Sequence, residues 1–227
     1  MHEIKLAIFD MAGTVVNEDN VVYKTLQKAI SDHEIAVDLP YVLEHGAGKE
    51  KLTAIKDIIA SKDASVGLSR AEEIYAYFKT ELNKAYAALE VTSYNRVEML
   101  LQLLKKSGVK VVLNTGYDRE TAQLLLHKMQ WQVGAQYDLL VTADDVTMGR
   151  PHPDMIFEAM NAFGITDPQF VLKAGDSIID IEEGKNAKCG LTVGVTTGAH
   201  SAEQLKSAQP TYVMDALWEL KDKLLLS

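Results

Sequence analysis

The 227-residue sequence contains one cysteine, no run of about 18 apolar residues, and fewer basic than acidic side chains. The single thiol, Cys189, cannot form a disulfide within the chain, and no set of Cys and His residues has the spacing of zinc ligands. We interpret Cys189 as a small buried side chain. The apolar start is broken by Lys5 and Asp10, so we expect neither a signal peptide nor a membrane-spanning helix. These absences predict a cytoplasmic protein.

Positive charge is also scarce, because 23 Lys and Arg residues face 32 Asp and Glu residues and give a formal net charge of −9. A surplus of negative charge is unsuited to the phosphate backbone of nucleic acids and to anionic membranes, so we expect neither as a partner. The net negative charge does not exclude a small phosphorylated substrate, since a local site can be positive on an acidic protein. The sequence contains almost no information on the oligomeric state, and a homodimer is one alternative.

Short β-rich runs alternate with helical patterns over most of the chain. The expected strands are Lys5–Phe9, Val109–Leu113, Leu139–Thr142, Phe170–Lys173 and Leu191–Val195. The helical patterns are Arg96–Lys106, Arg119–Gln130, Asp154–Phe163 and Ile178–Ala187. This alternation predicts an α/β fold, a doubly wound (Rossmann-like) parallel sheet with helices on both faces. Ligands bind beyond the carboxyl ends of the strands in such sheets.

The segment from about Val15 to Thr92 lacks a convincing strand pattern. Its helical patterns are Val22–Asp32, Lys49–Ala60 and Ser69–Leu89. A helical insert of this size after the first strand predicts a cap over the carboxyl edge of the sheet. We therefore expect a core domain of residues 1–14 and 93–227 and a helical cap domain of residues 15–92. One continuous domain with long helical excursions is the alternative.

Polar residues follow four of the expected strands, at the edge where a ligand would bind. They are Asp10 with Gly13 and Thr14, then Asn114 to Tyr117, then Asp144 and Asp145 with Gly149 to Pro153, and last Gly175 to Asp180. Phosphoryl transfer depends on positioning and on neutralised charge, and each group could contribute to it. The strand ends therefore predict a phosphoryl-transfer site.

Each of these residue types has a physical role in such a site. Asp10 could attack phosphorus as a nucleophile, and Thr115 with neighbouring backbone N–H groups could hold phosphoryl oxygens. Arg150 supplies a permanent cation. Asp10 and Asp176, with a backbone carbonyl, offer the hard oxygen ligands that Mg²⁺ prefers. Asp180 would support the metal ligands or orient Arg150.

The order of these motifs resembles the haloacid dehalogenase superfamily over nearly the whole chain. The pattern is DxxGT at Asp10, a hydroxyl after the second strand, a basic residue before proline, and GDSxxD at Asp176. The resemblance implies a hydrolase with Asp10 as the nucleophile and Mg²⁺ as the cofactor. It implies metal ligands at Asp10, Ala12, Asp176 and Asp180, and substrate contacts at Ala12, Gly13, His45, Gly116 and Tyr117.

Ala12 departs from the phosphatases of this superfamily, in which the residue two after the nucleophile is an Asp that acts as general acid and base. Proton transfer to a leaving group is worth about 10²–10⁴-fold in rate, and a methyl group cannot supply it. The motif Asp10-x-Ala12-Gly13-Thr14 resembles the phosphonoacetaldehyde hydrolase branch. In that branch a cap lysine forms an imine with the substrate aldehyde, so the carbon leaves phosphorus as an enamine.

Lys49, in the sequence His45-Gly46-Ala47-Gly48-Lys49, resembles that lysine. The same spacing is also found in the substrate-contact loop of β-phosphoglucomutase-like relatives, so imine formation, substrate binding and a solvated position all stay open for Lys49. The branch typically has methionine and histidine where this chain has His45 and Leu52. His45 could instead replace the missing proton donor.

The predicted function is cleavage of the C–P bond of phosphonoacetaldehyde or a related small phosphonate. The first alternative is a phosphomonoester phosphatase, similar to β-phosphoglucomutase or phosphoglycolate phosphatase, that lacks the usual general acid. The second is a non-catalytic homologue that keeps the Mg²⁺ site, although the full set of charged residues at the strand ends disfavours it.

Overall fold

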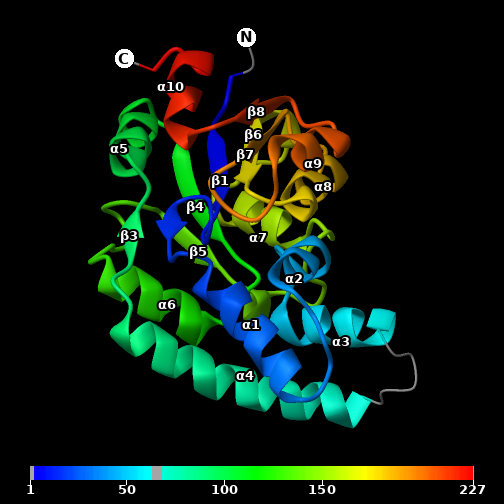
Figure 1. Cartoon of the computed structure of the whole chain (residues 1–227). Helices are drawn as coiled ribbons and strands as arrows, with labels where there is room; N and C mark the ends of the chain where they lie inside the picture. The colour runs from blue at the N-terminus through cyan, green and yellow to red at the C-terminus, as the bar shows by residue number, and fades with distance from the viewer. Residues whose placement is uncertain (1–2, 63–67, 227) are drawn as a thin grey trace.

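The computed structural model describes residues 3–62 and 68–226, and a six-stranded parallel sheet runs through its centre (Figure 1). The strand order is β5-β4-β1-β6-β7-β8. The strands are β1 (Leu6–Asp10), β4 (Lys110–Asn114), β5 (Leu139–Val141), β6 (Val171–Gly175), β7 (Leu191–Val195) and β8 (Tyr212–Met214). Every pairing is parallel. The predicted α/β fold with a parallel sheet is therefore confirmed, and β8 is an additional strand that the sequence analysis missed.

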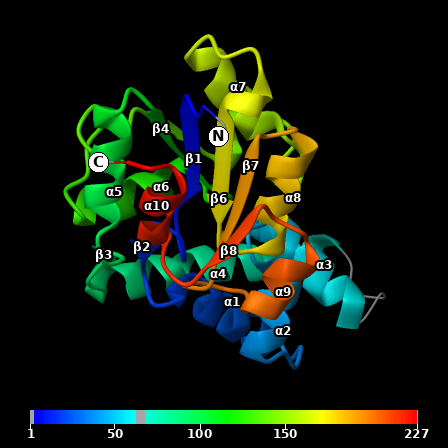
Figure 2. The ribbon, with the colours of Figure 1, turned by 90° about the horizontal axis from the view of Figure 1, so that it is seen from above.

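Helices cover both faces of the sheet (Figure 2). They are α5 (Val97–Lys106), α6 (Arg119–Lys128), α7 (Asp154–Ala162), α8 (Ile178–Asn186), α9 (Ala202–Ser207) and α10 (Leu220–Lys223), with the short 3₁₀ turns η1 (Ala143–Asp145), η2 (Pro168–Phe170) and η3 (Leu217–Glu219). Alternate residues of β1 enter two separate hydrophobic clusters. Ala7 and Phe9 pack with residues of α5 and α6, whereas Leu6 and Ile8 pack with residues of α7. A strand buried on both faces reads as a continuous apolar run, which is why β1 could be predicted.

Four helices lie together beyond the carboxyl ends of the strands (Figure 1). They are α1 (Val21–Asp32), α2 (Leu39–Gly46), α3 (Lys51–Lys62) and α4 (Leu68–Ala88), and we call them the four-helix segment. A short antiparallel pair, β2 (Val16–Asn17) and β3 (Thr92–Ser93), connects this segment to the rest of the chain. The expectation that residues from Val15 to Thr92 lack strands is therefore wrong, because two-residue strands are too short to give a period-2 pattern.

Two smaller expectations can also be compared with the structure. Cys189 is half-buried rather than fully buried and packs at the edge of the cluster that contains Leu6 and Ile8. Burial raises the pKa of its thiol to about 12, which makes it a poor nucleophile at neutral pH. Across the described ranges 3–62 and 68–226, no helix combines the length and the apolar character needed to span a membrane.

Candidate functional site

The parallel register brings the predicted nucleophile to the carboxyl edge of the sheet. Asp10 is the last residue of β1 and lies opposite Asn114, the last residue of β4. The backbone then turns at Gly13, whose φ of +86° is unfavourable for residues with a Cβ atom. A Cβ atom at Gly13 would also lie 2.3 Å from Oδ2 of Asp176. This glycine therefore allows the loops after β1 and β6 to approach each other closely.

Three buried carboxyl groups meet at this edge. Asp10, Asp176 and Asp180 each offer an oxygen, and these oxygens lie within 4.8 Å of one another. Burial, followed by repulsion from neighbouring carboxylates, raises the pKa values of Asp10 and Asp176. The Thr14 hydroxyl lies 3.4 Å from both Asp10 and Asp176. A hard dication would remove the repulsion between two such carboxylates, so this donor set fits Mg²⁺.

Asp180 has a different environment, because it contacts two buried cations. Its Oδ1 lies 3.0 Å from the guanidinium of Arg150 and 2.9 Å from the ammonium of Lys173. Burial alone would raise the pKa of Asp180, but the charges of Arg150 and Lys173 outweigh it and lower that pKa. Of the two roles predicted for Asp180, orientation of Arg150 matches these contacts. The Ser177 hydroxyl also donates to its Oδ2, at 2.5 Å.

Arg150 links the carboxyl cluster to the strand ends. One guanidinium nitrogen donates to Oδ1 of Asp10 at 2.7 Å, and Nε donates to Glu183 at 3.0 Å. The remaining nitrogen donates to the carbonyl and to the side-chain oxygen of Asn114, at 2.9 and 2.7 Å. This arrangement fixes the Asp10 carboxylate in one orientation, which a nucleophile requires.

The sequence analysis missed two buried residues of this network, Lys173 and Glu183. The Lys173 ammonium contacts Asp180, Glu183 at 3.2 Å and Asn114 at 2.8 Å. A signal was present for Lys173, since it is a lone charge inside the apolar run of β6. A charge in a fully buried strand requires partners, which could have pointed to the neighbouring strand ends.

Replacing Lys173 with methionine is expected to lower the free energy of unfolding by about 3–5 kcal/mol, because Arg150 would then be the nearest cation to both Asp180 and Glu183. Urea denaturation at pH 7 measures the change. Lys110→Met on β4 of the same sheet is the matched control, since Lys110 is exposed and should change stability by less than about 0.5 kcal/mol. Equal losses in the two variants would contradict a stabilising role for the buried network.

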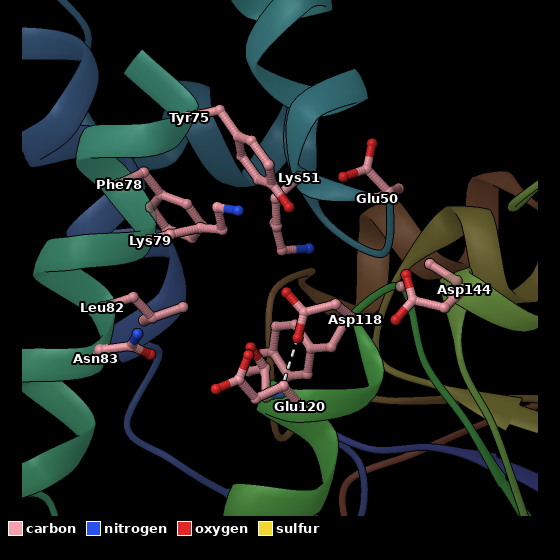
Figure 3. Close-up of a pocket in the computed structure, with 14 residues that line it drawn as sticks. Glu50, Lys51, Tyr75, Phe78, Lys79, Leu82, Asn83, Asp118, Glu120 and Asp144 are labelled. Carbon is pink, nitrogen blue, oxygen red and sulfur yellow. Dashed lines mark hydrogen bonds between the residues drawn. The ribbon is translucent and has the colours of Figure 1, made fainter. Parts of the chain in front are cut away.

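The structure separates two lysines that are close in the sequence. Lys51, the first residue of α3, is only 5% exposed and its amine points into the space between α4 and the loop before α6 (Figure 3). Its Nζ donates to the Lys49 carbonyl at 2.6 Å and lies 5.3 Å from the ring centres of Tyr23 and Tyr117. The Lys49 side chain is 26% exposed, and its amine pairs with Asp57 at 2.5 Å.

The environment of Lys51 favours the neutral amine. Burial is the main cause that lowers its pKa to about 8; the charges of Glu50 and Asp10 oppose this shift, and the charge of Arg150 adds to it. About a quarter of a lysine with this pKa is neutral at pH 7.5, against about one part in a thousand at the ordinary value. Lys51 lies beside a cavity of about 70 Å³, which is roughly the volume of two water molecules. Of the two lysines, Lys51 therefore has the properties of a nucleophilic amine.

The remaining predicted residues lie on two sides of the interface between the four-helix segment and the sheet. Thr115 is buried, and its hydroxyl accepts a hydrogen bond from the backbone of Tyr117. A Cβ atom at Gly116 would lie 2.9 Å from the carbonyl oxygens of Gly48 and Lys49, so the segment closes directly over this loop. His45 lies in the last turn of α2 and packs against Tyr41 with the two rings tilted, with 4.2 Å between ring centres.

Comparisons with known proteins agree with this geometry. Residues 4–188 match the family model of the haloacid dehalogenase-like hydrolases. The chain is 32% identical to a phosphonoacetaldehyde hydrolase of Latilactobacillus sakei over 86% of this chain and 76% of the relative. It is 28% identical to one from Bacillus cereus strain AH187, over 98% and 86%. A phosphonoacetaldehyde hydrolase-like protein from Oleispira antarctica superposes with a TM-score of 0.83 at 22% identity, over 98% of this chain and 92% of that protein.

Proposed function

Because the chain belongs to the haloacid dehalogenase-like hydrolases and is a hydrolase enzyme, we propose that it cleaves the C–P bond of phosphonoacetaldehyde or a related small phosphonate. In this proposal Asp10 attacks phosphorus and Lys51 forms an imine with the substrate aldehyde. The names of its relatives support the substrate class. The observation that carries the proposal is the buried Lys51 amine beside a small cavity.

Imine formation accounts for the alanine at position 12. When the Lys51 amine condenses with the aldehyde, the carbonyl oxygen leaves as water and a protonated C=N bond remains. As the C–P bond breaks, its electron pair moves into the new C=C bond of an enamine. The carbon leaving group then needs no proton from a residue two positions after the nucleophile. Imine formation at Lys51 thus removes the need for a general acid at position 12, which is why alanine can occupy it.

The phosphoryl group would be handled at the carboxyl edge of the sheet. Asp10 and Asp176, with the backbone carbonyl of Ala12, would hold Mg²⁺, which neutralises phosphoryl charge when it is bound. Arg150 holds the Asp10 carboxylate in place. Backbone N–H groups near Thr115 would orient the phosphoryl oxygens.

We further propose that residues 15–92 form a cap that opens to admit substrate and closes to exclude water. A close contact between the four-helix segment and α8 supports this role. A Cβ atom at Gly48 would lie 2.4 Å from Ile179 and 2.6 Å from the Ser177 hydroxyl. The short β2–β3 pair is where the chain enters and leaves the segment.

The charges around the cavity favour an aldehyde over a carboxylate at the far end of the substrate. Four acidic residues line it together with Lys51 and Lys79, namely Glu50, Asp118, Glu120 and Asp144 (Figure 3). A phosphate ester that also carries a carboxylate, such as phosphoglycolate, would be repelled there. The phosphomonoesterase alternative is therefore the weaker candidate for this class of ester.

Purified protein with Mg²⁺ should release phosphate from phosphonoacetaldehyde at least about 10²-fold faster than from a panel of phosphate monoesters, since the missing general acid costs about that much on an ester. Borohydride added during turnover should trap a covalent adduct, which peptide mass spectrometry should locate at Lys51. Rapid release from esters without any aldehyde-dependent adduct would instead support the phosphatase alternative.

A further inference from the structure

Glu18 is a buried carboxyl group between β2 and α1 that the chemistry above leaves unused. It is only 2% exposed. Its Oε2 accepts hydrogen bonds from the Val22 amide at 3.1 Å and from the Tyr86 hydroxyl at 3.2 Å. A neutral amide side chain could satisfy the first turn of α1 equally well, without the cost of burying an ionisable group. The carboxyl group therefore calls for a further explanation.

A chain of buried hydroxyls extends from Glu18 toward Lys51. The hydroxyls of Tyr86 and Tyr117 lie 3.3 Å apart, and both side chains are buried. The Tyr117 ring is one of the two aromatic rings next to the Lys51 ammonium. Both Lys51 and Tyr117 line the small cavity, which has room for about two water molecules between polar groups. The path thus joins α3, the loop after β4, α4 and the start of α1.

Several ionisable groups act on Glu18 from the surrounding elements. Burial raises the pKa of Glu18 to about 7, and the charge of Lys51 acts in the opposite direction. Burial also raises the pKa values of Tyr86, Tyr117, Tyr23 and Tyr94, so these phenols stay neutral near pH 7. In this surrounding, Glu18 and Lys51 are the two groups that change charge close to neutral pH.

We propose that Glu18 takes up the proton that the Lys51 ammonium loses before its amine attacks the substrate carbonyl. The inference rests on the proposed function. One proton leaves Nζ for the Tyr117 oxygen through a cavity water, while the Tyr117 proton moves to Tyr86 and the Tyr86 proton moves to Glu18. A buried ammonium and carboxylate become a neutral amine and a neutral acid, so no unpaired charge is created.

Glu18 does not touch the substrate. It is a positioning residue, because it acts on Lys51 only through the two tyrosines that carry the proton. With the four-helix segment closed over the site, bulk solvent would be excluded, so the ammonium would give its proton to a group inside the site. The return path also balances. After the amine has attacked, the hydroxyl of the resulting carbinolamine needs one proton to leave as water, and the same proton passes back from Glu18 through Tyr86 and Tyr117 as the protonated C=N bond forms.

The test is the pH profile of kcat with phosphonoacetaldehyde for Glu18→Gln, which keeps the size and the hydrogen-bond acceptor but cannot ionise. The carboxylate form of Glu18 is the competent base, so wild-type kcat should fall as the pH drops through about 7. In the variant, kcat should fall at least about tenfold at pH 7 while KM stays within about twofold. The deficit should narrow toward pH 9, where Lys51 deprotonates without help.

Asp19→Asn is the matched control, because Asp19 is an exposed carboxylate in the same loop and pairs with Lys24. It should keep the wild-type profile. If Glu18→Gln does not fold, Tyr86→Phe breaks the same path and should give the same change in profile. A wild-type profile in a folded Glu18→Gln or Tyr86→Phe variant would overturn the relay. Failure of the wild-type enzyme to form an adduct at Lys51 would instead overturn the proposed function.

Discussion

Lys51→Arg is expected to abolish phosphate release from phosphonoacetaldehyde and to prevent the borohydride-trapped adduct. Arginine keeps the positive charge but cannot form an imine, so the loss should exceed about 10³-fold. Lys49→Arg is the matched control two residues earlier. Because the Lys49 amine is partly exposed and paired with Asp57, this variant should retain at least about half of the activity. Initial rates of phosphate release at pH 7.5 measure both effects.

The two variants show whether Lys49 or Lys51 supplies the amine that forms the imine. The motif alone favours Lys49, whereas the burial and lowered pKa of Lys51 favour Lys51. Loss of activity and adduct in Lys49→Arg, with both retained in Lys51→Arg, would restore the motif-based assignment. Retention of activity in both variants would rule out imine chemistry and make His45 the next residue to test as a proton donor.

The fold could be predicted because the sheet is buried on both faces. The strands β1, β4, β6 and β7 are short apolar runs, and amphipathic helices separate most of them. The helices and strands that could not be predicted are short. In α2 the start signal is present, since Asp38 accepts from the Tyr41 amide and proline follows in the first turn, but eight residues give little periodicity. The strands β2, β3 and β8 have at most three residues each.

The candidate site could be located because its residues follow strand ends in a recognisable order. The structure brings Asp10, Asp176, Asp180 and Arg150 together, and the matching family model confirms the resemblance that their order suggests. Their individual roles stay predictions. Lys173, Glu183 and Glu18 were missed because a single charged residue carries no motif, and its importance depends on which side chains the fold places around it.

The choice between Lys49 and Lys51 illustrates the same limit. Lys51 is the first residue of α3, whereas Lys49 lies in the bend before it, so helical periodicity alone does not decide which of the two faces inward. Which lysine faces inward depends on where α3 begins. Glu50 accepts from the amides of Leu52 and Thr53, which starts the helix at Lys51 and turns that side chain toward the interior. The sequence contains this capping pattern, but only the packed structure shows that the Lys51 side chain points toward the interior.

Asp176→Asn is expected to weaken Mg²⁺ binding by more than about 10²-fold, because loss of even an outer partner of a metal ligand costs about 10–100-fold. Asparagine is preferred to alanine, since it keeps an acceptor for the Ala199 amide at 2.6 Å. Titration calorimetry with MgCl₂ measures the affinity without reference to turnover. Asp144, an exposed carboxylate after β5, gives the matched control, and Asp144→Asn should bind Mg²⁺ as the wild type does.

The pH dependence of Mg²⁺ binding gives a second measure of the same site. Burial raises the pKa values of Asp10 and Asp176, and repulsion from neighbouring carboxylates adds to this (Asp180 for Asp10, and Asp10 with Asp180 for Asp176), so protons compete with the metal. Affinity should therefore fall as the pH is lowered, with proton release on binding, whereas Asp180 should stay ionised because cations lower its pKa. Activity that is unchanged in EDTA, or an affinity that is independent of pH, would contradict a metal site formed by these two carboxylates. Bound Mg²⁺ would attract both carboxylates more strongly than they repel each other, and would therefore keep Asp10 ionised, as the proposed nucleophile must be.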